Sequence, residues 1–233
     1  MIFKFKSFDI SQSEAAMKVG TDGVLLGAWA NPTSYPHKIL DIGTGTGLIA
    51  IMLAQRFSES NIQAIEIDKL TSIEAQSNAQ ASPWAERIQI AHCSLQNYSS
   101  AVNFDLIVCN PPFFSKTTKP NNQRRALARN SESLELGFLI EKSHKLLNEH
   151  GMLALVLPSN EYTNIQSYAQ SAGLFITQIC WVRGNEKSPV KRLLIGLSKK
   201  KATVKESDLT IENSRHNYTE DYKKLCEDFY LKL

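Results

Sequence analysis

Short apolar runs alternate with longer amphipathic runs through most of this chain, from residue 38 to residue 197. The short runs are largely β-branched and aliphatic, which is typical of buried strands. The longer runs repeat apolar residues at three- and four-residue spacing, which is typical of helices. The predicted strands cover residues 38–42, 62–67, 88–92, 104–109, 152–157, 174–182 and 193–197, and the predicted helices cover residues 47–57, 69–81, 134–148 and 161–172. This order predicts an α/β fold with seven mostly parallel strands and helices on both faces of the sheet.

The segments at the two ends of this pattern predict the rest of the fold. No helix pattern separates the last two strands, so we expect an antiparallel final hairpin. Residues 1–31 predict a two-stranded element and a helix that begins near Thr21 or Asp22, either of which can cap its first amides. Residues 199–233 predict one more strand and a closing helix from about Thr219. Because no linker or repeat divides the chain, we expect one domain over residues 1–233, with a core at 37–198 and an N-terminal extension that covers the site.

Composition narrows the class of protein. Of the 233 residues, 42% are apolar and 21% are charged, which excludes a disordered or fibrous chain. No apolar stretch approaches the roughly 20 residues that cross a bilayer, and the N-terminus lacks the apolar block of a secretory signal. The four cysteines show no CxxC pair and no His cluster at ligand spacing. We therefore expect a cytoplasmic protein with reduced thiols, no membrane segment and no metal site.

A glycine-rich segment, Asp41-Ile42-Gly43-Thr44-Gly45-Thr46-Gly47, lies where the first core strand ends and a helix begins. In a doubly wound sheet this turn lies beside the topological switch point, and glycines let the backbone pass close to a nucleotide-like ligand. The glycine spacing differs from the dinucleotide fingerprint, and no Gly-Lys-Ser/Thr ending follows. The segment therefore disfavours NAD and ATP.

A carboxylate ends the second core strand at Glu66, and Asp68 follows two residues later. A carboxylate at this tip is well placed to accept hydrogen bonds from both ribose hydroxyls of an adenosyl group. We favour Glu66 because it belongs to the strand end. The alternative is that both acids are solvated and the glycines only form a tight turn. Because the glycine-rich segment and the acidic strand end occur together, this alternative is less favoured.

The tetrad Asn110-Pro111-Pro112-Phe113 directly follows the apolar run 104–109. Two prolines cannot continue a sheet, so the strand must end and the backbone is stiff at this point. The Asn side-chain oxygen and the Pro111 carbonyl can together accept both hydrogens of an exocyclic amino group, and Phe113 offers a face on which a base can stack. The alternative is a plain turn with Phe113 in the core.

Together, the glycine loop, Glu66 and the tetrad resemble the class I S-adenosylmethionine-dependent methyltransferases, which have a Rossmann-like fold and an (N/D)PP(Y/F/W) motif. A closer resemblance covers nearly the whole chain and is carried by residues 17–30, residues 82–88, the tetrad and the C-terminal NYTEDYKKL…FYL pattern. These segments resemble a family of bacterial adenine-N6 methyltransferases that act on the anticodon loop of tRNA1(Val). The resemblance implies S-adenosylmethionine as cofactor and tRNA as partner.

The resemblance also implies roles for individual residues. The implied catalytic residues are Asn110, Pro111, Pro112 and Phe113. The implied cofactor-binding residues are Asp41, Gly43, Thr44, Gly45, Gly47, Glu66, Ile67, Ser94, Leu95 and Asn110. Two departures concern Phe113, where many adenine-N6 enzymes have Tyr, and Ser94, where related enzymes often have Asp.

Basic residues cluster in two loops, although the formal net charge of +3 does not by itself indicate a nucleic-acid partner. Residues 106–131 contain no acid, and the final hairpin carries a second cluster. We expect both loops at one rim of the sheet, where the residues proposed to bind RNA phosphates are Lys116, Arg124, Arg125, Arg129, Lys191 and Arg192.

Three other functions remain open at this stage. An NPPF tetrad also occurs in enzymes that methylate guanine N2 of ribosomal RNA, and a glutamine side chain of a protein suits the same clamp. A non-enzymatic RNA-binding module with a vestigial cofactor pocket is the third, but the intact glycines, Glu66 and Asn110 argue against it.

Overall fold

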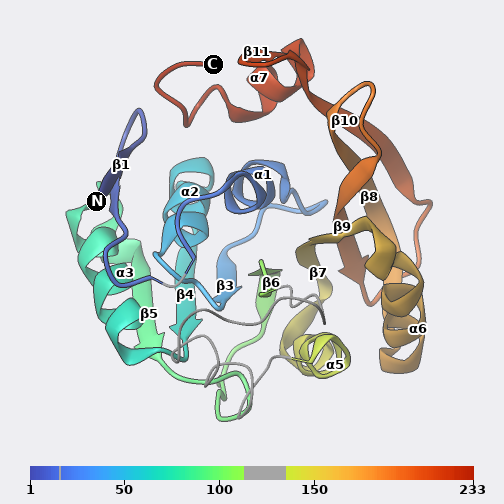
Figure 1. The fold of residues 1–233 in the computed structure, drawn as a ribbon. Helices are drawn as coiled ribbons and strands as arrows, with labels where there is room; N and C mark the ends of the chain where they lie inside the picture. Colours follow the sequence, from blue (N-terminus) through green and yellow to red (C-terminus); the bar gives the residue numbers. More distant parts are fainter. Residues whose placement is uncertain (16, 113–134) are drawn as a thin grey trace, which may run out of the picture.

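A nine-stranded sheet runs through the molecule in the order β11-β10-β8-β9-β7-β6-β3-β4-β5, and helices lie on both of its faces (Figure 1). The computed structural model describes residues 1–15, 17–112 and 135–233. The strands of this sheet are β3 (Lys38–Ile42), β4 (Asn61–Glu66), β5 (Ile88–His92), β6 (Phe104–Cys109), β7 (Leu147–Pro158), β8 (Phe175–Asn185), β9 (Val190–Ser198), β10 (Lys205–Ser214) and β11 (Asn217–Tyr218). A separate hairpin is formed by β1 (Ile2–Lys4) and β2 (Asp9–Ser11). The α-helices in the described residues are α1 (Thr21–Trp29), α2 (Leu48–Arg56), α3 (Lys69–Ala81), α5 (Leu136–Leu146), α6 (Tyr162–Ala172) and α7 (Glu220–Cys226).

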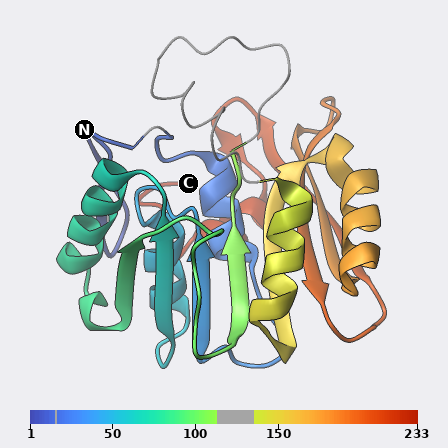
Figure 2. The ribbon, with the colours of Figure 1, turned by 90° about the horizontal axis from the view of Figure 1, so that it is seen from below.

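The strand directions confirm the mostly parallel sheet and its antiparallel final hairpin. Strands β5, β4, β3, β6 and β7 pair in parallel, whereas β9 pairs antiparallel with both β7 and β8. The carboxyl ends of the parallel strands and of β8 therefore meet at one edge. In Figure 2 the green strand β6 points toward this edge, at the top of the view.

The predicted count of seven strands is too small for the sheet as a whole. The seven core strands are present, but β10 adds in parallel to the edge of β8, and β11 pairs with β10. An edge strand presents unpaired amides and carbonyls, and the C-terminal strand satisfies those of β8. The pattern of residues 199–233 predicts one more strand but does not say where it pairs.

Alternation along each core strand sorts apolar side chains into two cores. In β7, Met152, Ala154 and Val156 belong to the core shared with α1 and α2, whereas Leu153 and Leu155 belong to the core shared with α5 and α6. Successive side chains of a strand point to opposite faces, so a continuous apolar run serves both cores. This explains why the central strands read as unbroken apolar runs.

Helix α1 begins at Thr21 as predicted, but the prediction that Thr21 or Asp22 caps it is wrong. The N-cap is Gly20, and no side chain accepts a hydrogen bond from the first turn. The Asp22 carboxylate instead lies beside Arg192, with 2.8 Å between Oδ2 and Nε. Thr21, Asp22 and Gly23 of this first turn line a cavity at the carboxyl edge.

The other end of α1 is held tightly against α2. A Cβ on Gly27 would lie 2.8 Å from Met52 Sδ and 3.2 Å from Met52 Cβ, so any larger residue would require Met52 to shift. Arg56 donates hydrogen bonds from Nη1 to the carbonyls of Gly27 (2.8 Å) and Ala30 (2.6 Å). Burial lowers the pKa of Arg56 to about 10. These contacts close the last turn of α1, which has no basic residue of its own.

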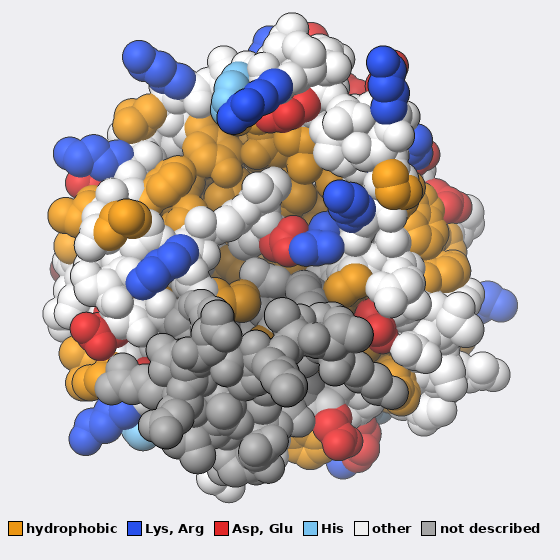
Figure 3. Space-filling view, in the orientation of Figure 1, with side chains coloured by type: hydrophobic (Ala, Val, Ile, Leu, Met, Phe, Trp, Pro, Cys, Tyr) orange, Lys and Arg blue, Asp and Glu red, His pale blue; other side chains and the backbone are white. Residues whose placement is uncertain are grey.

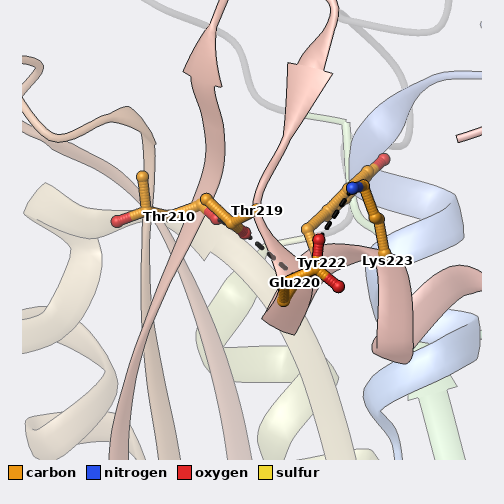
Figure 4. Close-up of polar contacts among 5 residues, drawn as sticks. All are labelled: Thr210, Thr219, Glu220, Tyr222 and Lys223. Carbon is orange, nitrogen blue, oxygen red and sulfur yellow. Dashed lines mark hydrogen bonds and ion pairs between the residues drawn. The ribbon is translucent and has the colours of Figure 1, made fainter.

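The N-terminal and C-terminal segments of the chain lie side by side, and both pack into the core shared with α1 and α2. Phe5 bridges to Tyr230, and the Lys6 amide donates to the Phe229 carbonyl at 2.8 Å. Helix α7 starts at the predicted place because the Thr219 hydroxyl accepts a hydrogen bond from the Tyr222 amide at 3.2 Å. The same hydroxyl donates to the Thr210 carbonyl of β10 at 2.5 Å, so α7 is anchored to the sheet (Figure 4).

Candidate active site at the carboxyl edge of the sheet

The glycine loop between β3 and α2 adopts a backbone that favours glycine. Gly43, Gly45 and Gly47 have φ angles of 68°, 59° and 83°. A Cβ on Gly43 or Gly45 would meet nothing within 4 Å, whereas one on Gly47 would lie 3.3 Å from the Ala75 carbonyl oxygen. The first two glycines therefore border open space, and the third allows the loop to pack against α3.

Asp41 lies beneath this loop and is fully buried. Its Oδ2 accepts hydrogen bonds from Thr44 Oγ1 at 2.6 Å and from the Ala50 amide at 3.2 Å, while Oδ1 is buried without a partner among the described residues. Burial raises the pKa of Asp41 to about 7, even though these two hydrogen bonds favour the charged form. Asp41 therefore holds the loop to the first turn of α2, and its contact with a cofactor stays a prediction.

Glu66 and Asp68 have separate roles at the tip of β4. Glu66 Oε2 accepts a hydrogen bond from the Gly45 amide, and Oε1 accepts one from the Asp68 amide, both at 3.0 Å. Asp68 caps α3 by accepting a hydrogen bond from the Thr71 amide at 2.8 Å. Each carboxylate oxygen of Glu66 has a second lone pair, so ribose recognition by Glu66 stays a prediction that its position permits.

A cavity of about 390 Å³ opens beside the loop. Its described walls are the N-terminal segment Met17–Gly23, the loop residues Gly43–Thr46 with Leu48 and Ile49, and the pair Asn110 and Arg192. Figure 3 shows this face hollowed near its centre, with apolar side chains on the walls and Lys and Arg side chains around it. A volume of this size suits a nucleoside-sized ligand.

Asn110 reaches the cavity from the end of β6. Its Oδ1 is buried and has no hydrogen-bond partner within the described part of the chain. Most buried side-chain oxygens in proteins are paired, and those that are not often serve a ligand. Pro111 is buried and Pro112 is exposed, whereas Phe113 lies outside the described residues.

The remaining predicted cofactor contacts lie farther along the same edge and are not among the described lining residues of the cavity. Ile67 is 43% exposed. Leu95 is buried in the second core, and the Ser94 hydroxyl accepts a hydrogen bond from the Asn97 amide at 3.3 Å. Contacts of Ile67, Ser94 and Leu95 with a cofactor stay predictions.

The structure assigns different surroundings to the two predicted RNA-binding residues that it describes. Lys191 is exposed on β9, but Arg192 lines the cavity and pairs with Asp22. The other four, Lys116, Arg124, Arg125 and Arg129, lie outside the described residues. Asp22 could not be placed in the site from the sequence, because its partner Arg192 is 170 positions away.

Two further features concern metals and membranes. Across residues 1–15, 17–112 and 135–233, no cluster of three or more His, Cys, Asp or Glu side chains could hold a metal ion. None of the helices in these ranges is long and apolar enough to span a membrane.

The geometry fits an adenosyl cofactor. Open space borders Gly43 and Gly45, the Glu66 carboxylate adjoins the loop, and the Asn110 Oδ1, which has no partner among the described residues, borders the same cavity. This arrangement permits the predicted roles: close backbone approach at the glycines, a ribose acceptor at Glu66 and an acceptor for a reacting amino group at Asn110.

Comparisons with known proteins agree with this geometry. Residues 13–168 match the family model described as methyltransferase small domain. A tRNA1(Val) (adenine(37)-N6)-methyltransferase from Trichodesmium erythraeum is 45% identical, over 99% of this chain and 98% of that protein. One from Flavobacterium psychrophilum is 43% identical over the full length of both chains.

Solved structures show the same fold. A predicted O-methyltransferase from Agrobacterium tumefaciens superposes with a TM-score of 0.66 at 16% identity, covering 89% of this chain and 96% of that one. A putative class I S-adenosylmethionine-dependent methyltransferase from Listeria monocytogenes superposes with a TM-score of 0.58 at 15% identity, covering 81% and 62%. The predicted class I fold and family resemblance are thus confirmed, and the chain belongs to the methyltransferase small domain family and, within it, to the family of the tRNA1(Val) (adenine(37)-N6)-methyltransferases.

Proposed function

We propose that this chain transfers the methyl group of S-adenosylmethionine to the N6 amino group of adenosine 37 in tRNA1(Val). The names of relatives that are 40–45% identical over nearly the whole chain support this activity. The observation that carries it is the Oδ1 of Asn110, which is buried at the border of the cavity and has no hydrogen-bond partner in the part of the chain that the structure describes.

Asn110 is suited to orient the target nitrogen. Its Oδ1 and the Pro111 carbonyl accept the two hydrogens of the N6 amino group, which holds the nitrogen lone pair toward the methyl donor. The two prolines keep this pair of acceptors stiff. Phe113 lies outside the described residues, and its proposed role, stacking on the adenine, rests on the sequence alone.

The glycine loop and its supports are suited to hold the cofactor. Asp41 accepts a hydrogen bond from Thr44 Oγ1, and Glu66 accepts one from the Gly45 amide. These contacts organise the loop backbone before a ligand binds. When bound, S-adenosylmethionine supplies an electrophilic methyl group on a sulfonium, which removes the need for a metal or a strong base. The chain therefore acts mainly by orientation and by hydrogen bonding to the reacting nitrogen.

The lining of the same cavity supports a proposal for the domain organisation. We propose that residues 1–31 form a lid over cofactor and substrate, since Met17–Gly23 line the cavity wall. Residues 37–198 form the catalytic core. Lys191 and the basic residues of the segment after the tetrad are proposed to contact RNA phosphates, with Arg192 as a contact closer to the cofactor.

Nucleoside analysis tests the function directly. Unmodified total tRNA and ribosomal RNA are incubated with the protein and labelled cofactor, and the labelled nucleosides are separated. We expect N6-methyladenosine in tRNA1(Val), formed about a hundredfold or more slowly by Asn110→Ala. Label in N2-methylguanosine of ribosomal RNA, or in a protein fraction added to the same assay, would reject adenosine 37 as the target.

A further inference from the structure

Helix α3 presents two buried polar side chains, Glu74 and Asn78, to the N-terminal segment. They are four residues apart and so share one face of the helix. The carboxylate of Glu74, a residue that is 8% exposed, accepts four hydrogen bonds from residues 11–15. The donors are Ser11 Oγ (3.1 Å) and the Ser13 amide (2.5 Å) to Oε1, and the amides of Glu14 (3.1 Å) and Ala15 (3.0 Å) to Oε2.

Asn78 ties the same segment to the glycine loop. Its Oδ1 accepts a hydrogen bond from the Ser11 amide at 2.9 Å. Its Nδ2 donates to the carbonyls of Ser11 and Thr46, both at 2.8 Å. Since Thr46 lines the cavity, one side chain sets the distance between strand β2 and the loop.

The anchored residues are coupled to the cavity wall. The side-chain carbonyl of Gln12, which is almost fully buried, accepts a hydrogen bond from the Val19 amide at 2.7 Å. Lys18 Nζ donates to the Ser13 carbonyl at 3.3 Å and also to the Gln12 carbonyl. Val19 and Lys18 line the cavity, so a shift of residues 11–15 moves the wall with them.

Only a carboxylate suits the position of Glu74. Three backbone amides and one hydroxyl converge on it, and a carboxylate offers two oxygens that accept hydrogen bonds and no donor. Burial opposes its charged form, but the hydrogen bonds from residues 11–15 outweigh this effect and hold the pKa of Glu74 below its usual value. Glutamine would turn an NH₂ donor toward amide donors.

We propose that Glu74 and Asn78 are positioning residues for the cofactor: they hold the N-terminal wall of the cavity in register with the glycine loop and thereby set the affinity for S-adenosylmethionine without touching it. The inference rests on the proposed function only in taking the cavity as the cofactor site. The identity of the target base does not enter.

Calorimetry with S-adenosylhomocysteine and thermal unfolding test the proposal on three proteins: wild type, Glu74→Gln and Asp105→Asn. Asp105 is the matched control, because its carboxylate also accepts two backbone hydrogen bonds, from His37 and Lys38 at 2.9 Å, but at the opposite edge of the sheet. Both variants should unfold at lower temperature. Only Glu74→Gln should weaken cofactor binding, by roughly tenfold or more, as expected when hydrogen bonds to a charged group are lost.

A pair of serines provides a milder version of the same experiment. Ser11 Oγ donates to Glu74, whereas Ser13 reaches Glu74 only through its backbone amide. Ser11→Ala should raise the KM for S-adenosylmethionine about threefold to tenfold with little change in kcat, and Ser13→Ala should leave both near wild type. These variants keep the test decisive if Glu74→Gln does not fold.

The outcomes separate this inference from the proposed function. If Glu74→Gln, or Ser11→Ala in its place, binds S-adenosylhomocysteine within twofold of wild type, the side chains are merely structural and the proposal is overturned. If wild type does not bind S-adenosylhomocysteine, the cofactor assignment and this proposal fall together. If wild type binds it and the variants bind weakly, the proposal holds even when no N6-methyladenosine is formed.

Discussion

The two edges of the central sheet are built from the same strands but treat polar groups in opposite ways. At the amino edge, Asp105 accepts hydrogen bonds from the amides of His37 and Lys38 and from Asn148 Nδ2. At the carboxyl edge, Asp41 and Asn110 each keep a buried oxygen without a partner among the described residues. The first edge is satisfied internally, and the second is prepared for a ligand.

The cavities at the two edges also differ in whether a lining side chain has a buried polar atom without a partner among the described residues. A hollow of about 260 Å³ also lies at the amino edge, lined in part by Lys38, Gln63 and Phe104. None of its described lining residues holds a buried oxygen or nitrogen without a partner. Three left-handed glycines, Gly43, Gly45 and Gly47, border the carboxyl edge, and a fourth, Gly173, ends α6. Unpaired buried acceptors therefore distinguish the carboxyl edge from an edge that only closes the fold.

The largest expected effect comes from the unpaired amide at the carboxyl edge. Asn110→Ala should lower kcat about a hundredfold or more, because it removes an acceptor for the reacting amino group. The affinity for S-adenosylhomocysteine should change little. Single-turnover methylation and calorimetry together check this, and near-normal turnover would show that the tetrad is structural.

Glu66→Ala should have the next largest effect, a weakening of cofactor binding by about tenfold to a hundredfold. The variant loses the proposed ribose contact and also frees the Gly45 amide. Calorimetry with S-adenosylhomocysteine measures the loss. Preferential binding of NAD by wild type in the same experiment would contradict the adenosyl-methionine assignment.

The basic segment after the tetrad is expected to contribute to RNA affinity. Replacing Arg124, Arg125 and Arg129 together by Ala should weaken tRNA binding roughly tenfold or more at low salt and reduce the salt dependence, because fewer counterions are released. Cofactor affinity should be unchanged. Filter binding at several salt concentrations checks this, and unaltered tRNA affinity would place the RNA path elsewhere.

Asp41 provides a pH test of the carboxyl edge. Its pKa is about 7 in the folded protein against 3.8 as the ordinary value, so the folded state binds the proton more tightly. The stabilisation from this proton is fully present below about pH 4 and is lost as the pH rises through about 7, so this group lowers the free energy of unfolding between these limits. Asp41→Asn should remove this pH dependence, which changes the free energy of unfolding by a few kcal/mol at most between the two limits. Urea unfolding from pH 5 to pH 8 measures it, and an unchanged slope would contradict the burial argument.

The smallest effect on activity is expected at the amino edge. Asp105→Ala should lower the free energy of unfolding by roughly 1–3 kcal/mol, because two strand-start amides and Asn148 lose their acceptor. The kcat and the KM for both substrates should stay within about twofold of wild type, since no part of the cavity is touched. A large loss of activity without loss of stability would remove the contrast between the edges.

Local patterns along the chain predict the strands, the glycine loop, the acidic strand tip and the Asn-Pro-Pro turn. Each of these depends on neighbours within a few residues: alternation gives the strands, positive φ requires the glycines, and prolines end β6. This is why β3, β5 and β6 have the predicted bounds and why the carboxyl edge could be assigned before the structure was known.

Only the tertiary structure decided which distant groups meet. The pairing of Asp22 with Arg192, the hydrogen bonds that Glu74 accepts from residues 11–15, and the addition of β10 to β8 join positions far apart in the chain. A carboxylate on a helix has the same local pattern whether it faces water or three backbone amides. Its partner is set by how the elements pack, because the free energy of a buried charge depends on the donors that surround it and not on its neighbours in sequence.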